Sequence, residues 1–211
     1  PFFLYLPLTA PHTPWLPTRK FEGKSKAGIY GDFVAMVDDV IGQVTAALRA
    51  NGQEQNTLLI LTSDNGAHWT PEDRARYEHR ANAWWRGQKA DIHDAGHRIP
   101  FLARWPGHIA PGTVSGQLTC LTDLMATAAE INGITLKPGE GEDSFSFLGA
   151  ATGKAPNQTA RPSIVHHSSE GMFAMRRGEW KYIEGLGSGG FTEPKRINSV
   201  PGGPIGQLYN L

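Results

Sequence analysis

The chain has 211 residues, and its 20 basic and 20 acidic side chains give a formal net charge of zero. This length suits one moderately large domain, or a domain with a small appended piece, and the balanced charge gives no reason to expect a nucleic-acid partner. The single cysteine, Cys120, excludes an intrachain disulfide and a cysteine-based zinc site, and no apolar run approaches membrane-spanning length.

The first third of the chain predicts strand, helix and strand in succession. Residues 2–8 are typical of a buried strand, and the prolines within residues 10–15 predict a rigid loop. Apolar residues recur at steps of three and four over residues 29–50, which predicts an amphipathic helix, and Asn51-Gly52 would end it. A second apolar strand is expected over residues 57–63.

The remainder predicts a long connection, one strand, one helix and a group of short strands. Residues 67–100 lack periodicity, and residues 101–105 are typical of a strand. Thr122 can cap a helix that runs to Ile131, and residues 134–162 are loop-like. Three short strands are expected at 163–167, 172–176 and 180–183, with a turn at Arg177-Gly178-Glu179 between the last two.

This order predicts an α/β fold with a mostly parallel central sheet and a small antiparallel C-terminal sheet. Near-continuous apolar strands separated by a helix belong in a parallel sheet that is covered on both faces. The expected organisation is an α/β part over residues 1–133, connecting loops over 134–162, and a small antiparallel subdomain over 163–211.

The first candidate site lies where the apolar run at residues 57–63 ends in Asp64, Asn65 and Gly66. Ligands and cations in open α/β sheets collect at the carboxyl ends of strands, and carboxylate and amide oxygens suit a hard cation. Asp-Asn-Gly is also a common turn sequence. Locally, a turn without a ligand and a metal or substrate site are equally good interpretations.

Two further segments can reach the same sheet edge. His12 follows the first expected strand, and residues 86–100 carry Lys89, His93 and Arg98 before the chain re-enters the sheet. Alone, His12 would be an ordinary loop histidine and Lys89 a solvated lysine. His93 is a weaker candidate for lining the cleft, and Arg98 could equally pair with a carboxylate that holds the loop.

Taken together, these segments resemble the formylglycine-dependent sulfatases of the alkaline phosphatase superfamily, over nearly the whole chain and in the family's order. The matching stretches are Phe3-Leu4-Tyr5-Leu6, Pro11-His12-Thr13-Pro14, residues 30–39, Ser63-Asp64-Asn65-Gly66, Arg86-Gly87-Gln88-Lys89, residues 96–101, Arg104-Trp105-Pro106-Gly107, Thr122-Asp123-Leu124-Met125, residues 175–182 and Leu208-Tyr209-Asn210-Leu211.

The resemblance implies an alkaline-phosphatase-like sandwich and hydrolysis of sulfate esters, either aryl or carbohydrate, with carbohydrate favoured. It implies that Asp64 and Asn65 bind Ca²⁺, and that His12 and Lys89 act as catalytic residues that contact the sulfate group. The chemistry agrees, because a lysine ammonium is a compact charge for a tetrahedral anion. His93 is carried over only as a weak substrate contact.

The chain lacks two features of this family. It contains no Cys/Ser-x-Pro-x-Arg motif, which would be converted to the formylglycine nucleophile, and the sequence around Cys120 does not match it. The paired aspartates that complete the calcium sphere are also absent, and Ca²⁺ takes about six to eight oxygen ligands. We therefore expect a fragment that is inactive alone, with the nucleophile in a missing N-terminal half as its partner. A periplasmic or secreted location is expected from the resemblance.

Two alternative functions remain open on the sequence. One is a phosphatase or a phosphodiester or phosphonate hydrolase of the same superfamily, although such enzymes commonly have a histidine where this chain has Asn65. The other is a non-catalytic descendant that binds sulfated glycans. The expected partner is a sulfated small molecule or glycan.

Overall fold

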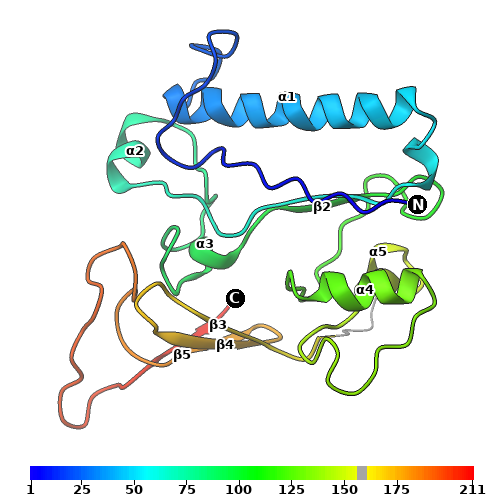
Figure 1. The fold of residues 1–211 in the computed structure, drawn as a ribbon. Coiled ribbons are helices and arrows are strands. Elements are labelled where there is room, and N and C mark those ends of the chain that lie inside the picture. The colour runs from blue at the N-terminus through cyan, green and yellow to red at the C-terminus, as the bar shows by residue number, and fades with distance from the viewer. Residues whose placement is uncertain (156–160) are drawn as a thin grey trace. The chain divides into compact units, whose positions relative to one another are not determined.

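The structure is a computed structural model that describes residues 1–155 and 161–211, so part of the loop expected over 134–162 lies outside the described residues. The chain divides into two compact units. The first comprises residues 1–57 and 69–83, and the second comprises residues 58–68 and 84–211. Helices and strands both occur (Figure 1), which confirms the mixed α/β class.

The first unit is built on the long helix α1 (Gly28–Ala50), at the position that the apolar spacing predicts. The helix ends at Asn51, and Gly52 follows with φ +66°, a left-handed conformation that glycine adopts without a Cβ penalty. Near its start, the Asp32 carboxylate accepts hydrogen bonds from the amides of Gly23 (2.8 Å) and Ser25 (2.7 Å). Asp32 thereby fixes the preceding loop to the helix.

Trp69 joins α1 to the second stretch of this unit. Its side chain is buried, and its ring lies 5.0 Å from Tyr30 on α1 and 5.8 Å from Tyr77. Between these contacts the chain forms α2 (Pro71–Arg76), whose Thr70 and Asp73 make a capping box. Helix α2 is not predicted by the sequence, because a helix of six residues is too short to show an apolar period. The short 3₁₀ turn η1 (Glu54–Asn56) also belongs to this unit.

The prediction of a buried strand over residues 2–8 is wrong. These residues form no strand, and their large side chains are exposed, with Phe3 91% accessible. An apolar run becomes a strand only when a partner satisfies its backbone groups and covers its side chains. No strand among the described residues pairs with this segment.

The second unit contains a two-stranded sheet of β1 (Leu59–Thr62) and β2 (Phe101–Arg104), both at expected positions. The two strands are antiparallel, with Leu59 opposite Arg104 and Thr62 opposite Phe101, so the parallel arrangement expected here is wrong for this pair. The connection from 63 to 100 returns to the end of the sheet at which β1 finished, and the next strand must therefore run in the opposite direction.

The predicted antiparallel C-terminal sheet is confirmed, with four strands in the order β3-β4-β5-β6 (Figure 1). The turn at residues 177–179 joins β4 to β5, and Gly178 has φ +57°. Strand β6 is not predicted by the sequence, because its alternation extends over only four residues. The strand bounds are Ile164–His167 (β3), Phe173–Arg177 (β4), Trp180–Ile183 (β5) and Gln207–Asn210 (β6).

One face of this sheet carries the apolar core of the second unit. Ile92 and Ile183 are fully buried, and they form a cluster with Met172 and Ala174 against which Tyr209 packs. Ile92 comes from the long connection between β1 and β2 and not from the sheet itself. The core therefore holds the segment around Lys89 and His93 against the C-terminal sheet.

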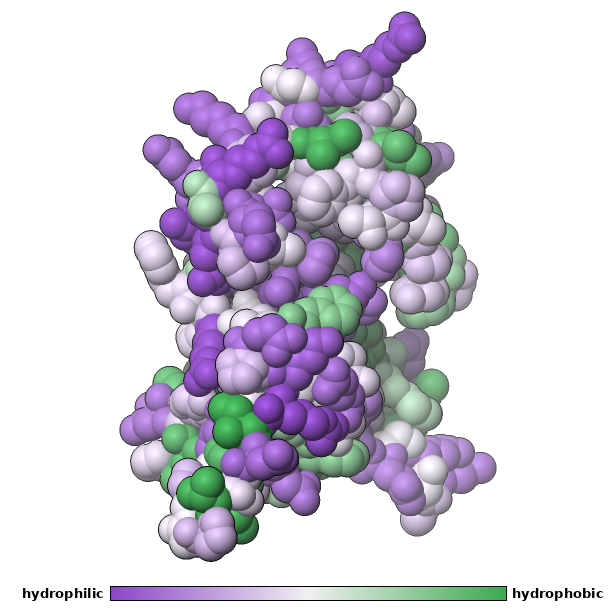
Figure 2. Space-filling model, turned by 90° about the vertical axis from the view of Figure 1, so that its left-hand side faces the viewer, coloured by the Kyte–Doolittle hydropathy of each residue, from purple (hydrophilic) through white to green (hydrophobic). Residues whose placement is uncertain are grey.

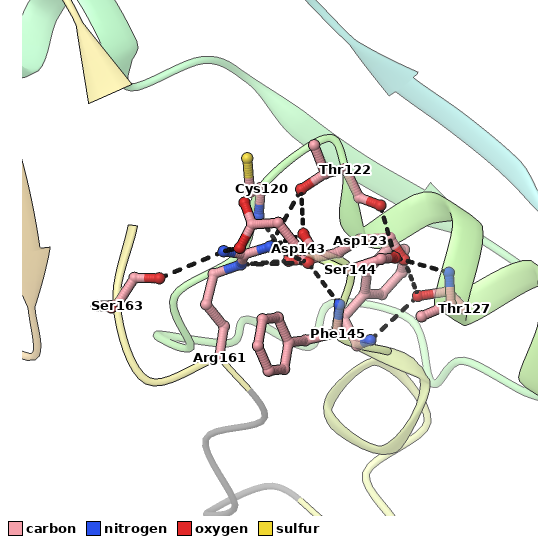
Figure 3. Close-up of polar contacts among 11 residues, drawn as sticks. Cys120, Thr122, Asp123, Thr127, Asp143, Ser144, Phe145, Arg161 and Ser163 are labelled. Carbon is pink, nitrogen blue, oxygen red and sulfur yellow. Dashed lines mark hydrogen bonds and ion pairs between the residues drawn. The ribbon is translucent and has the colours of Figure 1, made fainter. Parts of the chain in front are cut away.

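A buried ion pair organises the region around α4 (Asp123–Ile131), which lies where a helix was predicted (Figure 3). The Arg161 guanidinium contacts the Asp123 carboxylate at 2.6 Å, and both side chains are 1% exposed. Arg161 also donates to the Asp143 carboxylate (3.0 Å). The expected capping by Thr122 is wrong, because its hydroxyl donates to the Asp143 carbonyl, and Asp123 instead accepts the amide of Cys120 at 2.8 Å.

The remaining helices of this unit are short, namely α3 (Asp94–His97) and α5 (Leu148–Ala151). On the face drawn in Figure 2, hydrophobic side chains are scattered among hydrophilic ones, as the balanced composition leads one to expect. Within the part of the chain that the structure describes, no helix has the length and apolar character needed to cross a membrane.

Removal of the Arg161 side chain tests the buried pair. We expect Arg161→Met to lower the free energy of unfolding by about 3 kcal/mol or more, because it leaves the Asp123 carboxylate buried without its cation. Lys195→Met is the control, since Lys195 forms a solvent-exposed pair with Glu170 at 3.6 Å and should cost less than about 1 kcal/mol. Urea unfolding measures both, and equal small losses would contradict a stabilising role for the pair.

Candidate metal and anion site

The candidate metal ligands stand in the turn that follows β1. The Ser63 hydroxyl donates to the Asn65 carbonyl (3.0 Å), and the Asn65 Nδ2 donates to the Gly66 carbonyl (3.2 Å). The Asp64 side chain is exposed, and none of the described residues donates to its carboxylate or to Asn65 Oδ1. Two hard oxygen ligands on adjacent residues are therefore free to accept a cation.

Gly66 fixes where this turn lies in the second unit. Its amide donates to the carbonyl of Gly96 at 3.0 Å. A Cβ at Gly66 would stand 1.7 Å from the carbonyl oxygen of Ala95, a backbone atom that cannot move aside cheaply. Only glycine allows the two segments to approach so closely, and the Asp64-Asn65 turn is thereby held against the loop of residues 86–97.

The same loop carries Lys89, and its backbone lies beside the turn. The Lys89 amide donates to the carbonyl of Ala67 at 3.0 Å, only two residues after Asn65. The Lys89 side chain is half-buried, and its ammonium forms no hydrogen bond or ion pair with any described residue. The structure thus brings together Asp64, Asn65 and the backbone of Lys89, with unsatisfied side-chain groups on all three.

Asp94 anchors the other end of the loop. Its carboxylate accepts from the Lys181 ammonium (2.8 Å) and from Arg98 Nε (2.9 Å). Burial acts to raise the pKa of Asp94, but the hydrogen bonds and charges of Lys181 and Arg98 outweigh it and hold that pKa below its ordinary value. Arg98 also lies over the Trp85 ring at 3.6 Å. The carboxylate partner expected as one role for Arg98 is therefore confirmed.

Asp94 and Lys181 were not predicted from the sequence as anchors of the loop. The spacing of four residues between Asp94 and Arg98 on a helix was a usable signal. Lys181 lies two residues before Ile183 and therefore on the same inner face of β5, which indicates that its side chain is buried. Its partner Asp94 is 87 residues away in the sequence. Nothing local in the sequence identifies that partner.

His93 is turned toward the C-terminal sheet. Its side chain is buried, its Nε2 lies 3.4 Å from Gln207 Oε1, and its ring meets Tyr209 edge-on at 6.2 Å. Burial, and then the nearby charge of Arg86, lowers its pKa. A cavity of about 130 Å³ adjoins it, lined by residues that include Trp85 and Arg86. Its weak assignment as a substrate contact stays a prediction.

His12 belongs to the first unit. It is exposed, its Nδ1 lies 2.7 Å from the Thr13 carbonyl oxygen, and its amide donates to the carbonyl of Thr9. The convergence of His12 with Asp64, Asn65 and Lys89 stays a prediction, because those residues lie in the second unit.

Asp64 and Asn65 supply only part of a cation's coordination sphere. No group of three or more His, Cys, Asp or Glu side chains among the described residues is placed to hold a metal ion. Two protein oxygens leave most positions around Ca²⁺ to other donors. The expectation that further ligands lie outside the chain stays a prediction.

Comparison with known proteins identifies the family. A family model described as "Sulfatase" matches residues 1–134, which is more than half of the chain. The chain belongs to the sulfatase family. This confirms the family resemblance noted in the sequence.

Individual sulfatases match most of the chain. An N-acetylgalactosamine-6-O-sulfatase of Bacteroides thetaiotaomicron is 33% identical over 189 residues, which is 87% of this chain and 36% of that protein. The N-acetylgalactosamine-6-sulfatase of Mus musculus is 41% identical over 138 residues, which is 65% of this chain and 26% of that protein. The chain therefore spans about a third or less of these sulfatases.

A solved structure supports the same fold. It comes from work on the metabolism of multiple glycosaminoglycans by Bacteroides thetaiotaomicron, and it matches this chain with a TM-score of 0.84 and 31% identity. The match covers 100% of this chain and 44% of that protein. The chain described by our structure thus has the alkaline-phosphatase-like fold that was expected from its sequence.

Two half-buried histidines pack together where the loop meets the C-terminal sheet, and we expect them to give stability a pH dependence. The His97 and His166 rings lie 4.1 Å apart, and the Nε2 atom of each is buried without a partner among the described residues. Burial, followed by the charge of Lys181, lowers the pKa of His97 to about 4. Burial, followed by the charge of His97, lowers that of His166 to about 3.

We expect stability to fall as the pH drops from 6.5 toward 4. The unfolded chain takes up protons on both histidines from the ordinary pKa of 6.5, whereas the folded chain resists protonation until the pH reaches about 4 and then about 3. His166→Phe should make the dependence shallower over this window. Val165→Gln, at the exposed neighbouring position on β3, should leave it unchanged. Urea unfolding at several pH values measures the slope, and identical slopes in all three proteins would contradict the assignment.

Proposed function

We propose that the natural protein containing this chain hydrolyses sulfate esters, with a sulfated amino sugar as its substrate. The observation that carries the proposal is the hydrogen bond from the Lys89 amide to the carbonyl of Ala67, together with membership of the sulfatase family. It sets a lysine with an unpaired ammonium beside the turn that carries the unpaired oxygens of Asp64 and Asn65. A cation site next to a positive side chain suits a tetrahedral anion.

The donor atoms fit a calcium ion. The Asp64 carboxylate is exposed and unengaged, and Asn65 turns its Nδ2 to the Gly66 carbonyl, which leaves Oδ1 free to bind. Carboxylate and amide oxygens are the ligands that Ca²⁺ prefers, whereas zinc and manganese favour an imidazole that Asn65 cannot supply. When bound, the ion would neutralise negative charge on the sulfate oxygens.

The side chains of Lys89 and His12 would contact the sulfate ester directly. The Lys89 ammonium can donate to sulfate oxygens, whose negative charge grows as the S–O bond to the alcohol breaks. The imidazole of His12 can donate a hydrogen bond to the sulfate group or give a proton to the departing alcohol oxygen. Both roles need these side chains to meet at one point, and they are therefore part of the proposal.

A formylglycine from elsewhere in the natural protein would supply the oxygen that attacks sulfur. This chain has no Cys/Ser-x-Pro-x-Arg motif, so its own residues would bind and orient the ester and stabilise charge. We accordingly expect the isolated chain to be inactive.

The candidate substrate is an N-acetylgalactosamine that carries a 6-O-sulfate. Two of the most similar relatives are named N-acetylgalactosamine-6-sulfatases, and they match this chain over 87% and 65% of its length. The test is to incubate the purified natural protein with N-acetylgalactosamine 6-sulfate, an aryl sulfate and a phosphate monoester, and to measure sulfate and phosphate release. Faster phosphate release, or two zinc or manganese ions per site, would overturn the proposal.

Replacement of Lys89 tests its contact with sulfate. In the natural protein, Lys89→Ala and His12→Ala should each lower kcat by about two orders of magnitude, because a donor to the developing negative charge is lost. Lys137→Ala is the matched control, since Lys137 is an exposed lysine in the loop after α4. Steady-state kinetics measure the change, and near-normal turnover in either site variant would remove that residue from the site.

Replacement of Asp64 tests the metal site separately from catalysis. Asp64→Ala should lose bound calcium on desalting, because the chain's only charged oxygen ligand in the proposed site has been removed. Asp38→Ala removes an exposed aspartate of α1 and should retain as much calcium as the parent. Elemental analysis of the desalted proteins provides the measurement, and equal calcium in both variants would defeat the assignment of Asp64.

A further inference from the structure

Asp91 is a fully buried carboxylate in the loop that carries Lys89. Its Oδ1 accepts the amides of Phe191 (2.7 Å) and Thr192 (3.0 Å), and its Oδ2 accepts the amide of Gln88 (2.9 Å) and the Thr192 hydroxyl (2.5 Å). No described cation forms an ion pair with it. Four neutral donors from two distant segments therefore hold one negative charge.

These contacts close a tight turn around Lys89. The Asp91 amide donates to the carbonyl of Gln88 (3.1 Å), while the Asp91 carboxylate accepts the Gln88 amide from the other side. Between them, Ala90 has φ +78°, a conformation that a residue with a Cβ adopts only when its surroundings impose it. The turn is therefore strained at the residue next to Lys89.

The backbone of the same turn is held from two more directions. The Lys89 amide donates to the carbonyl of Ala67, and the Ser169 amide donates to the carbonyl of Ala90 at 2.9 Å. Ala67 belongs to the loop after β1, whereas Ser169 and Thr192 come from loops of the C-terminal sheet. Each residue from Lys89 to Asp91 is thus bonded to a segment that is distant in the sequence.

Gly190 permits this close approach. A Cβ at Gly190 would lie 2.4 Å from the carbonyl oxygen of Ala90 and 2.6 Å from the amide nitrogen of Asp91. These are backbone atoms, so a side chain at this position would have to push the loop of residues 188–192 away from the turn. Gly190 does not have a positive φ, and its substitution would act through this contact alone.

We propose that Asp91 is a positioning residue for Lys89. By binding the 191–192 amides and the Gln88 amide together, it fixes the backbone of the turn and sets where the Lys89 ammonium can reach. The proposal rests on the proposed function, in which Lys89 contacts the sulfate group. It adds that loops of the C-terminal sheet take part in placing that contact, and a misplacement of about 1 Å can cost up to a hundredfold in rate.

Asp91→Asn tests the role without a change of shape. One side of the asparagine becomes an NH₂ group, which meets the Gln88 amide or the 191–192 amides donor to donor. In the natural protein we expect kcat to fall by about tenfold or more with little change in KM. In a Lys89→Ala background, the same substitution should change kcat no further, because the side chain that it positions is already gone.

Asp123→Asn is the matched control. Asp123 is an equally buried carboxylate of the same unit, but its partners Arg161, Cys120 and Phe145 lie outside the Lys89 turn. Any effect of Asp123→Asn on kcat should be the same factor with and without Lys89. If Asp91→Asn also multiplied kcat by the same factor in both backgrounds, or left it at the parent value, the positioning role would be wrong.

The hydrogen bonds from the Gln88, Phe191 and Thr192 amides to the Asp91 carboxylate form a clamp on the Lys89 turn. Hydrogen exchange tests this clamp whether or not the protein hydrolyses a sulfate ester. Asp91→Asn and Gly190→Ala should both speed amide exchange in residues 87–92 and leave residues 123–131 unchanged. Gly116→Ala is the control, because a Cβ there meets no atom within 4 Å and its φ is not positive. Unchanged protection of residues 87–92 in both site variants would overturn the clamp, and absence of sulfate release by the parent would overturn only the proposed function.

Discussion

The buried ammonium of Lys181 is the interaction on which the candidate site depends. It stands on the inner face of β5, is 2% exposed, and donates to the Ile92 carbonyl (2.7 Å) and the Asp94 carboxylate (2.8 Å). An unpaired charge inside a protein costs several kcal/mol. The loop of residues 86–97 therefore cannot leave the sheet without exposing the Lys181 ammonium to solvent or leaving it buried without its partner. The C-terminal sheet and the loop therefore form one structural element.

The polar side chains of the loop of residues 86–97 and of the turn after β1 differ in whether they have partners. The two buried carboxylates of the loop are satisfied, since Asp91 accepts four hydrogen bonds and Asp94 pairs with Lys181 and Arg98. By contrast, the Asp64 carboxylate in the turn after β1 and the Lys89 ammonium of the loop have no hydrogen-bond or ion-pair partner among the described residues. The hydrogen bonds of the two buried carboxylates hold the backbone of the loop, and the unpaired groups of Asp64 and Lys89 are then free to bind a ligand without reorganisation.

Elements with a strong local signal were predicted well. Helix α1 follows the apolar spacing of residues 29–50, and the turn at Gly178 follows from its sequence alone. The strand expected over residues 2–8 did not form, because an apolar run specifies a strand only if a partner is present. Helix α2 and strand β6 were missed because each is too short to show its period.

The sequence by itself determined the family and singled out Asp64, Asn65 and Lys89 as candidate site residues, because these follow from short motifs read along the chain. Only the tertiary structure decided which groups hold them in place. Two partners of Asp91, Phe191 and Thr192, lie 100 and 101 residues away, and Lys181 meets Asp94 across 87 residues. Hydrogen bonds and ion pairs depend on distance in space, and no pattern along the chain encodes contacts between segments that only folding brings together.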